Sequence, residues 1–308
     1  MASCIIKLLE KQMRKGKDYV FDFNDPVAVK KFRETLLKMF SIMRKDGSVK
    51  IEKLQIGTIP TEKHTLKNIK VPDPMIMLHL HGGGYFSGSA EMYRAFLSGL
   101  CKKFQVHAYC ISYRLVPEYS YPAALDDAFT AYRWLTEEKS IPAEKIIILG
   151  DSAGGGLALA LLHRIGQSSL TQPKCAICIS PWTDLTLSFD SYKYNRENDA
   201  FFNFTNLENA AKLYIGNDSA ENPEISPIFG DFSSFPPVFL QVGSTEMLLN
   251  DSTVIAEKIK EQGVSVTIDV WEGLFHDFPI FSRMPVIGRL APEFRQAINN
   301  MKRFLDNL

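Results

Sequence analysis

The sequence predicts an α/β fold in which a mostly parallel sheet is covered by helices on both faces. Two observations support this fold class. Short apolar runs of strand length, such as 146–149 and 238–243, alternate along the chain with longer segments of helical periodicity. Apolar strands of this kind are typical of sheets that are buried on both faces, and strand–helix alternation is typical of parallel sheets.

Length and composition are those of a globular protein with a large core. The chain has 308 residues, of which 45% are apolar and 23% are charged. α/β folds often reach this length as one unit, so we expect a single domain over 1–308. The 35 basic and 35 acidic residues cancel. This balance gives no electrostatic reason to expect nucleic acid or an anionic membrane as a partner.

Two helices are expected before the first strand. Residues 3–15 carry apolar side chains on one face with basic residues around it. This pattern fits a membrane-surface helix or, as we prefer, a small helix packed over the domain. A second helix begins at Asn24-Asp25-Pro26, which supplies a cap residue and a proline at the first helical position. Its apolar residues recur at spacings of three and four, and Gly47 follows its end.

The rest of the chain alternates between apolar strands and amphipathic helices. Strands are predicted at 49–59, 75–80, 106–113, 146–149, 175–180, 238–243 and 266–271. Helices are predicted at 122–138, from 153 onward, near 207–214, and at 252–262 and 292–308. Residues 184–236, rich in Asn, Ser, Asp and aromatic residues, interrupt this order. We expect an insertion at about 184–220 that forms a helical cap together with about residues 1–46.

The five cysteines predict no disulfide framework. Their odd number in a long chain fits a reducing compartment, so we expect a cytoplasmic protein. Cys175 and Cys178 form a C-x-x-C pair, but residues three apart on a strand face opposite sides. We therefore interpret them as core residues and not as a zinc or redox site. The first residues lack the apolar core of a signal peptide, and no apolar run approaches the about 18 residues of a membrane span.

The chemistry is expected to centre on the turn after the strand at 146–149. Residues 150–154, GDSAG, match the pattern G-x-S-x-G around Ser152. Between a buried strand and a helix, this pattern holds a serine on a sharp turn with its hydroxyl exposed at the carboxyl edge of a sheet. The glycines allow strand and helix to approach closely. The helix amino terminus offers N–H groups and positive dipole to an oxyanion.

A serine nucleophile needs a base, and His276 is the candidate. Only two histidines follow Ser152 in the sequence, and in this arrangement the histidine follows the nucleophile and the acid. His163 lies about three turns along the helix, roughly 16 Å away, which is too far. His276 comes just after the strand at 266–271, where a loop at the sheet edge is expected.

The carboxylate that orients the base is expected just after the strand at 238–243. Glu246 lies within loop reach of that strand end, whereas Asp251 lies at the start of the next helix, where an acid has a capping role. We favour Glu246 and keep Asp251 as the alternative. Asp151, inside the turn, is interpreted as an acid at a helix amino terminus.

Donors for an oxyanion are expected from a glycine loop. Residues 81–85, HGGGY, directly follow the strand at 75–80 and match the HGGG loop of lipases and esterases. Each donor of this kind is worth about 3 kcal/mol. A dinucleotide-binding loop is the competing interpretation, but Ser87 stands in place of its third glycine and no acid ends a second strand about 20 residues on.

Five motifs in this order resemble the hormone-sensitive-lipase-like α/β hydrolases, which are carboxylesterases that include bacterial esterases and arylacetamide deacetylases. The motifs are HGGGY (81–85), YRLVPEYSYPAALDD (113–127), GDSAGG (150–155), SPWTDLT (180–186) and LFHDF (274–278). The resemblance covers about residues 75–308. It implies the α/β-hydrolase fold, with a mostly parallel central sheet, flanking helices and a helical cap.

The resemblance also implies roles for individual residues. Ser152 would be the nucleophile and His276 the base. Glu246 occupies the place of the family's usual Asp, 30 residues before His276. The oxyanion donors would be the N–H groups of Gly83, Gly84 and Ala153.

The activity that we expect is hydrolysis of small, short-chain acyl esters through an acyl-enzyme, without a metal or organic cofactor. Amidases and lactonases use the same triad, so both remain alternatives. A third alternative is a non-catalytic binding protein, as in the gibberellin receptors that resemble this family but lose the histidine; this chain keeps both Ser152 and His276. We expect a small-molecule ester as the partner, no nucleic acid and no transmembrane segment. A homodimer would be unsurprising for the family.

Overall fold

The computed structural model describes residues 2–308 and contains an eight-stranded sheet. The strands are β1 (Val49–Ile56), β2 (Ile59–Leu66), β3 (Ile76–Leu80), β4 (His107–Ile111), β5 (Ile146–Asp151), β6 (Cys175–Ile179), β7 (Val238–Gly243) and β8 (Val266–Trp271). They lie in the order β1-β2-β4-β3-β5-β6-β7-β8. The pairings of β1 with β2 and of β2 with β4 are antiparallel, and the other five are parallel. The prediction of a mostly parallel sheet is confirmed.

Helices connect the strands. They are α1 (Cys4–Met13), α2 (Pro26–Ser41), α3 (Arg94–Phe104), α4 (Ala123–Arg133), α5 (Ala153–Gly166), α6 (Ser191–Tyr194), α7 (Phe204–Ile215), α8 (Leu249–Glu261), α9 (Ile287–Leu290) and α10 (Pro292–Asp306). Short 3₁₀ or π turns are η1 (Arg14–Gly16), η2 (Trp134–Glu138), η3 (Ala143–Lys145), η4 (Pro227–Phe229) and η5 (Phe278–Arg283).

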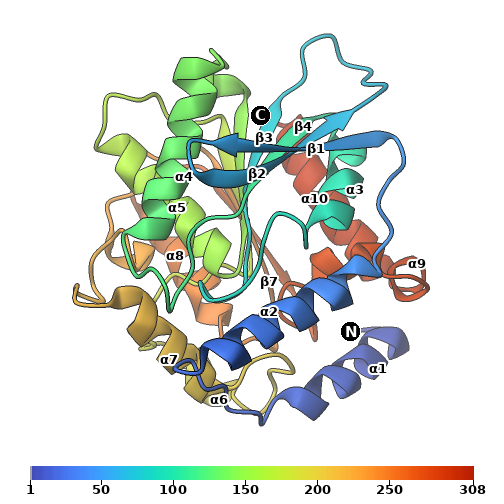
Figure 1. Ribbon diagram of the computed structural model, residues 1–308, viewed down its shortest axis with the longest axis vertical. Coiled ribbons are helices and arrows are strands. Elements are labelled where there is room, and N and C mark those ends of the chain that lie inside the picture. The colour runs from blue at the N-terminus through green and yellow to red at the C-terminus, as the bar shows by residue number, and fades with distance from the viewer. Residues whose placement is uncertain (1) are drawn as a thin grey trace.

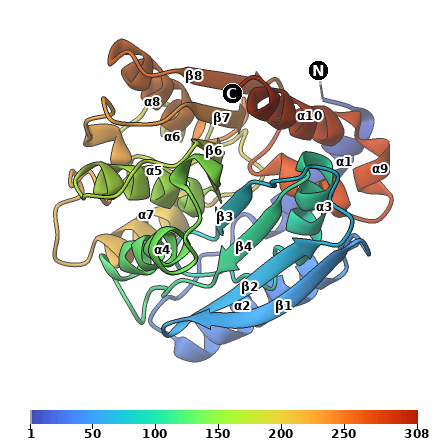
Figure 2. The ribbon, with the colours of Figure 1, turned by 90° about the horizontal axis from the view of Figure 1, so that it is seen from above.

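Both faces of the sheet are covered (Figure 2). Helices α4, α5 and α8 lie on one face, and α3 and α10 lie on the other. Alternate side chains of β5 enter the two cores: Ile146 and Ile148 pack on the α5 side, and Ile147 and Leu149 pack on the α3 side. A central strand of a covered sheet has no solvent face, which is why 146–149 is apolar throughout.

The segment predicted as one strand at 49–59 is instead part of a hairpin. β1 ends at Ile56, and Gly57 turns the chain with a φ of 57°, which glycine adopts at little cost. β2 then pairs back along β1. β2 was not predicted as a separate strand because its buried residues include Glu62, and glutamate is rarely buried unless it is paired. Here Arg94 forms an ion pair with Glu62 at 2.5 Å.

Helix α3 is absent from the elements predicted above. Its buried residues recur at spacings of three and four, which is the helical period; they include Phe96, Leu97, Leu100, Cys101 and Phe104. The residue at its N-cap position is Tyr93, whose side chain makes no capping hydrogen bond. The helix therefore lacks the usual start signal and depends on packing against the sheet.

Four helices gather at one end of the molecule, namely α1, α2, α6 and α7 (Figure 1). Hydrogen bonds join the early segment to the later one. The Arg14 guanidinium donates to the Glu197 carbonyl at 2.7 Å, and the Phe21 N–H donates to the Asn206 side chain at 2.8 Å. Segments more than 180 residues apart in the sequence are thus side by side.

The cysteines carry free thiols, with Cys4 exposed and the other four buried. Cys175 belongs to the core on the α3 side of the sheet and Cys178 to the core on the α5 side. Their opposite directions follow from the two-residue period of a strand, so the interpretation of both as core residues is confirmed. No helix within residues 2–308 is long and apolar enough to cross a bilayer.

Candidate active site

Ser152 lies on a strained turn between β5 and α5. Its φ of 53° and ψ of −125° are unusual for a residue with a side chain, and such strain persists only where the surroundings impose it. Close backbone contacts at the neighbouring glycines, Gly150 and Gly154, impose this conformation. A Cβ on Gly150 would lie 2.1 Å from the carbonyl oxygen of Gly154, and a Cβ on Gly154 would lie 2.1 Å from that of Leu80. Strand and helix can approach this closely only with glycine at both positions.

Backbone hydrogen bonds from the next strand hold this turn in place. The Ser152 N–H donates to the Ile179 carbonyl at 2.8 Å, and the Ser152 carbonyl accepts from the Trp182 N–H at 2.9 Å. Both partners lie at or just beyond the carboxyl end of β6. Ser152 is only 3% exposed, so a reactant at its hydroxyl would be shielded from bulk water.

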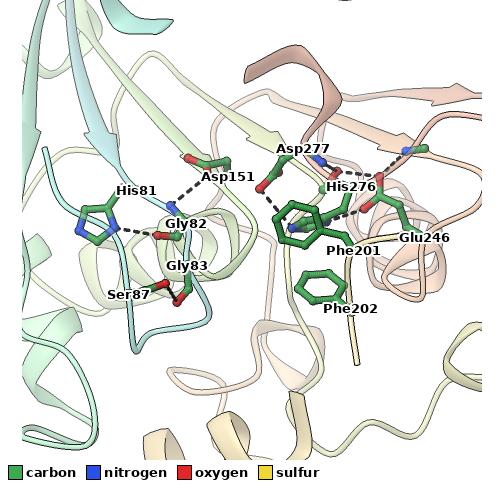
Figure 3. A network of polar contacts seen from close by, with 12 residues as sticks. His81, Gly82, Gly83, Ser87, Asp151, Phe201, Phe202, Glu246, His276 and Asp277 are labelled. Atoms are coloured by element: carbon green, nitrogen blue, oxygen red, sulfur yellow. Dashed lines mark hydrogen bonds and ion pairs between the residues drawn. The ribbon is translucent and has the colours of Figure 1, made fainter. Parts of the chain in front are cut away.

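His276 and Glu246 meet at the same edge of the sheet (Figure 3). Nδ1 of His276 donates to Oε2 of Glu246 at 2.7 Å, and both side chains are buried. The other carboxylate oxygen of Glu246 accepts from the Gly243 N–H at 2.5 Å and from the Ser180 hydroxyl at 2.8 Å. These contacts fix the carboxylate, and the carboxylate in turn fixes the tautomer and orientation of the imidazole.

Asp251, the alternative acid, and His163, the histidine excluded as the base, contact other groups. The carboxylate of Asp251 accepts from the Thr183 N–H at 2.7 Å and from the Tyr192 hydroxyl at 2.8 Å. It therefore joins α8 to the loop after β6 and has no hydrogen bond to His276. Nε2 of His163 lies 3.4 Å from the Pro227 carbonyl, on the far part of α5.

The glycine loop presents unpaired backbone donors. Gly83 and Gly84 have φ values of 117° and 61°, which side chains rarely tolerate. Their N–H groups, like that of Ala153 at the start of α5, have no acceptor among residues 2–308. His81 braces the loop: its Nδ1 donates to the Gly82 carbonyl at 2.8 Å. Burial lowers the pKa of His81 to about 4, so the ring is neutral.

Asp151 joins the glycine loop to the turn, a role that its interpretation as a helix-terminal acid missed. Its carboxylate accepts from the Gly82 N–H at 3.0 Å and the Tyr93 hydroxyl at 2.5 Å. The other oxygen lies 3.0 Å from Nε2 of His79. Three donors from three segments of the chain satisfy this fully buried charge, which fixes the loop relative to Ser152. The partners come from distant parts of the sequence, so no local pattern reveals them.

Residues 77–280 match the sequence profile of a family described as the alpha/beta hydrolase fold. The chain belongs to the α/β-hydrolase family. An esterase from Acinetobacter venetianus is 35% identical over 234 residues, which are 76% of this chain and 75% of that protein. An acetyl-hydrolase from Streptomyces hygroscopicus is 34% identical over 233 residues, with 76% of each chain covered.

Comparison with solved structures also places the chain among esterases. The crystal structure of an esterase from the bacterial hormone-sensitive lipase family covers 99% of this chain and 98% of its own, with a TM-score of 0.88 at 28% identity. This chain is therefore a hormone-sensitive-lipase-like α/β hydrolase, as its five motifs indicated. No group of three or more metal-ligating side chains within the described residues is arranged to hold a metal ion.

A second carboxylate faces the imidazole of this hydrolase, and the sequence interpretation missed it. Oδ2 of Asp277 lies 3.1 Å from Nε2 of His276 (Figure 3). Asp277 has a φ of 55°, which turns its side chain back toward the preceding residue. Within residues 2–308 Nε2 of His276 pairs with this carboxylate and forms no hydrogen bond to the Ser152 hydroxyl. The signal was present in the motif LFHDF, where the acid directly follows the histidine.

The two carboxylates determine the charge of the imidazole. Burial alone lowers the pKa of His276, but Asp277 and Glu246 outweigh it and raise this pKa well above its usual value. Burial raises the pKa of Asp277 to about 7, against the opposing effect of the His276 charge. The two carboxylates, one at each ring nitrogen, thus favour the protonated form of the imidazole.

Two aromatic rings of the insertion cover the histidine. The rings of Phe201 and Phe202 lie 5.3 and 4.3 Å from the His276 ring, centroid to centroid. Asp199 positions them, since its Oδ1 accepts from both of their N–H groups, at 2.7 and 3.0 Å. Its Oδ2 accepts from the Met247 N–H at 2.8 Å, directly beside Glu246. The segment that covers the site is thus tied to the loop that carries the acid.

Proposed function

We propose that the chain is a serine carboxylesterase in which Ser152 is the nucleophile, His276 the base and Glu246 the acid. The buried hydrogen bond between His276 and Glu246, at the sheet edge where the strained Ser152 turn lies, carries this proposal. A hydroxyl is a poor nucleophile until a base takes its proton, and the base needs a carboxylate to hold its tautomer. Esterases among the relatives support the choice of an ester bond.

The first step forms an acyl-enzyme. Oγ of Ser152 bonds to the ester carbonyl carbon while its proton passes to Nε2 of His276. This transfer requires Nε2 to be unprotonated and released from Asp277. The negative carbonyl oxygen of the tetrahedral intermediate is held by the N–H groups of Gly83, Gly84 and Ala153. The intermediate then collapses, and the leaving alkoxide takes the proton from Nε2.

The second step restores the enzyme. Water gives a proton to Nε2 of His276, and its oxygen attacks the acyl carbon. Collapse of the second intermediate breaks the bond to Ser152, whose oxygen recovers the proton from Nε2. The products are one carboxylic acid and one alcohol. Glu246 stabilises the imidazolium in both steps without changing its own charge.

Residues of about 1–46 and about 184–220 are proposed to form a cap over this site. Helices α1, α2, α6 and α7 belong to these segments, and Phe202 brings the cap against His276. On the other side, the rings of Tyr85 and Tyr214 stack at 3.6 Å and are both buried. Aromatic side chains of the cap therefore pack against the base and against Tyr85, which directly follows the glycine loop. This supports small, short-chain acyl esters as substrates, as does the name of the Streptomyces acetyl-hydrolase.

Hydrolysis of nitrophenyl esters of graded acyl length tests this function. Wild type is expected to turn over the acetate and butyrate faster than long-chain esters. Ser152→Ala is expected to abolish turnover, while Ser234→Ala, which changes an exposed serine, leaves it unchanged. No turnover of any ester by wild type, or full activity in Ser152→Ala, would refute the proposal. A flat or rising dependence on acyl length would refute only the short-chain preference.

A further inference from the structure

Asp277 carries a buried oxygen that the mechanism does not use. The residue is only 7% exposed, and its Oδ1 has no hydrogen-bond partner among residues 2–308. The other oxygen of this carboxylate, Oδ2, faces Nε2 of His276 at 3.1 Å. A buried carboxylate oxygen without a donor is costly, so its retention beside a reactive atom points to a ligand group that reaches it.

Geometry places the alcohol part of a substrate at this carboxylate. The leaving oxygen must come within about 3 Å of Nε2 to take its proton. Because Oδ2 of Asp277 lies 3.1 Å from the same nitrogen, atoms one or two carbons beyond the leaving oxygen come within reach of the carboxylate. The acyl group, on the other side of the carbonyl carbon, does not.

Charge favours a cation there. The site contains four buried carboxylates, those of Asp151, Asp199, Glu246 and Asp277, and among the described residues none of them forms an ion pair with a lysine or arginine. Asp151, Asp199 and Glu246 have three donors each. Within residues 2–308 the carboxylate of Asp277 has only Nε2 of His276 as a donor, and it loses that donor when the imidazole becomes an unprotonated base. At that stage a positive group on the substrate would compensate the buried charge.

The aromatic rings beside His276 also favour a positively charged group. Phe201 and Phe202 lie against the His276 ring, at 5.3 and 4.3 Å between centroids. Aromatic faces attract ammonium groups, and a quaternary ammonium is bound well by such rings because it needs no hydrogen bonds. We propose that Asp277, Phe201 and Phe202 form a leaving-group subsite that favours esters of small cationic alcohols. This inference rests on the proposed esterase function.

Two esters of the same shape test the subsite. Choline acetate and 3,3-dimethylbutyl acetate differ in that a quaternary nitrogen replaces a quaternary carbon, so the ratio of their kcat/KM values isolates the charge. Each enzyme is measured on the plateau of its own pH profile. Wild type is expected to favour the choline ester by at least about tenfold, and Asp277→Asn is expected to bring the ratio close to one. Phe202→Leu is expected to lower the ratio by a smaller factor.

Glu272→Gln provides the matched control. Glu272 is an exposed acid in the same loop as Asp277, and its neutralisation is expected to leave the ratio at the wild-type value. A wild-type ratio near one would overturn the subsite while leaving the esterase proposal intact. Equal ratios in wild type and Asp277→Asn would also overturn it. The proposed function itself would be refuted only if wild type cleaved neither of these esters and no nitrophenyl ester; cleavage of nitrophenyl esters alone would overturn the subsite.

Discussion

Replacing Asp277 with asparagine is expected to move the acidic limb of the kcat/KM profile to lower pH. His276, the proposed base, can accept a proton only when Nε2 is unprotonated. Burial lowers the pKa of His276, but the flanking carboxylates raise it well above the usual value. In wild type kcat/KM should therefore rise with pH through a limb that lies above the ordinary histidine range. Asparagine keeps the shape of the side chain but removes the negative charge beside Nε2. The pKa of His276 therefore falls, and Nε2 is unprotonated at a lower pH.

The distance between the two groups gives the size of the shift. One unit charge at 3.1 Å corresponds to about 5 kcal/mol at an effective dielectric constant of about 20, or roughly four pK units. Two effects reduce this value. Burial raises the pKa of Asp277 itself to about 7, so it carries only part of a charge near neutrality. Asparagine also retains an acceptor beside Nε2. We expect a net shift of about one to two units.

The assay is the pH dependence of kcat/KM for nitrophenyl acetate, followed at a wavelength where the nitrophenol absorbance does not change with pH. Glu272→Gln, which neutralises an exposed acid of the same loop, is expected to keep the wild-type limb. Circular dichroism and thermal unfolding check that each variant is folded. A limb that stays in place in folded Asp277→Asn, or moves to higher pH, would refute the assigned electrostatic role of Asp277.

Three further substitutions test the acid and the turn. Glu246→Gln is expected to lower kcat about a thousandfold or more with the fold intact. Asp251→Asn is expected to lower the unfolding temperature and keep most of kcat, because the hydrogen bonds of Asp251 join α8 to the loop after β6. The reverse pattern in kcat would show that Asp251 is the acid. Gly154→Ala is expected to destabilise the fold by about 1–3 kcal/mol or more and to reduce activity, since its Cβ would meet the Leu80 carbonyl oxygen at 2.1 Å. Denaturant unfolding and kcat check this, and a neutral effect on both would contradict the close approach.

The sequence predicted the parts of the site that depend on local pattern. The strand, turn and helix around Ser152 follow from an apolar run, two obligatory glycines and a helix start, all within about 20 residues. The placement of Glu246 and His276 in loops after their strands follows because the carboxyl ends of parallel strands meet at one edge of the sheet. The structure adds the hydrogen bond between these two side chains.

The features that sequence reasoning missed depend on contacts between distant segments. Helix α3 lacks a cap, and β2 buries Glu62 only because Arg94 pairs with it. The partners of Asp151 lie on other segments of the chain, so its place in the site could not be predicted from the turn alone. Asp277 directly follows His276 in the motif LFHDF, but the motif does not predict the left-handed backbone conformation of Asp277 or the approach of its carboxylate to Nε2.

Covalent labelling of Ser152 tests the central claim most directly. A nitrophenyl phosphonate ester reacts with an activated serine, releases nitrophenol and leaves a stable phosphonyl group that peptide mass spectrometry can locate. We expect one label per chain, on Ser152, with release of one equivalent of nitrophenol, and labelling slowed by orders of magnitude in folded His276→Ala. A label on another residue, or equal labelling rates in wild type and His276→Ala, would contradict it.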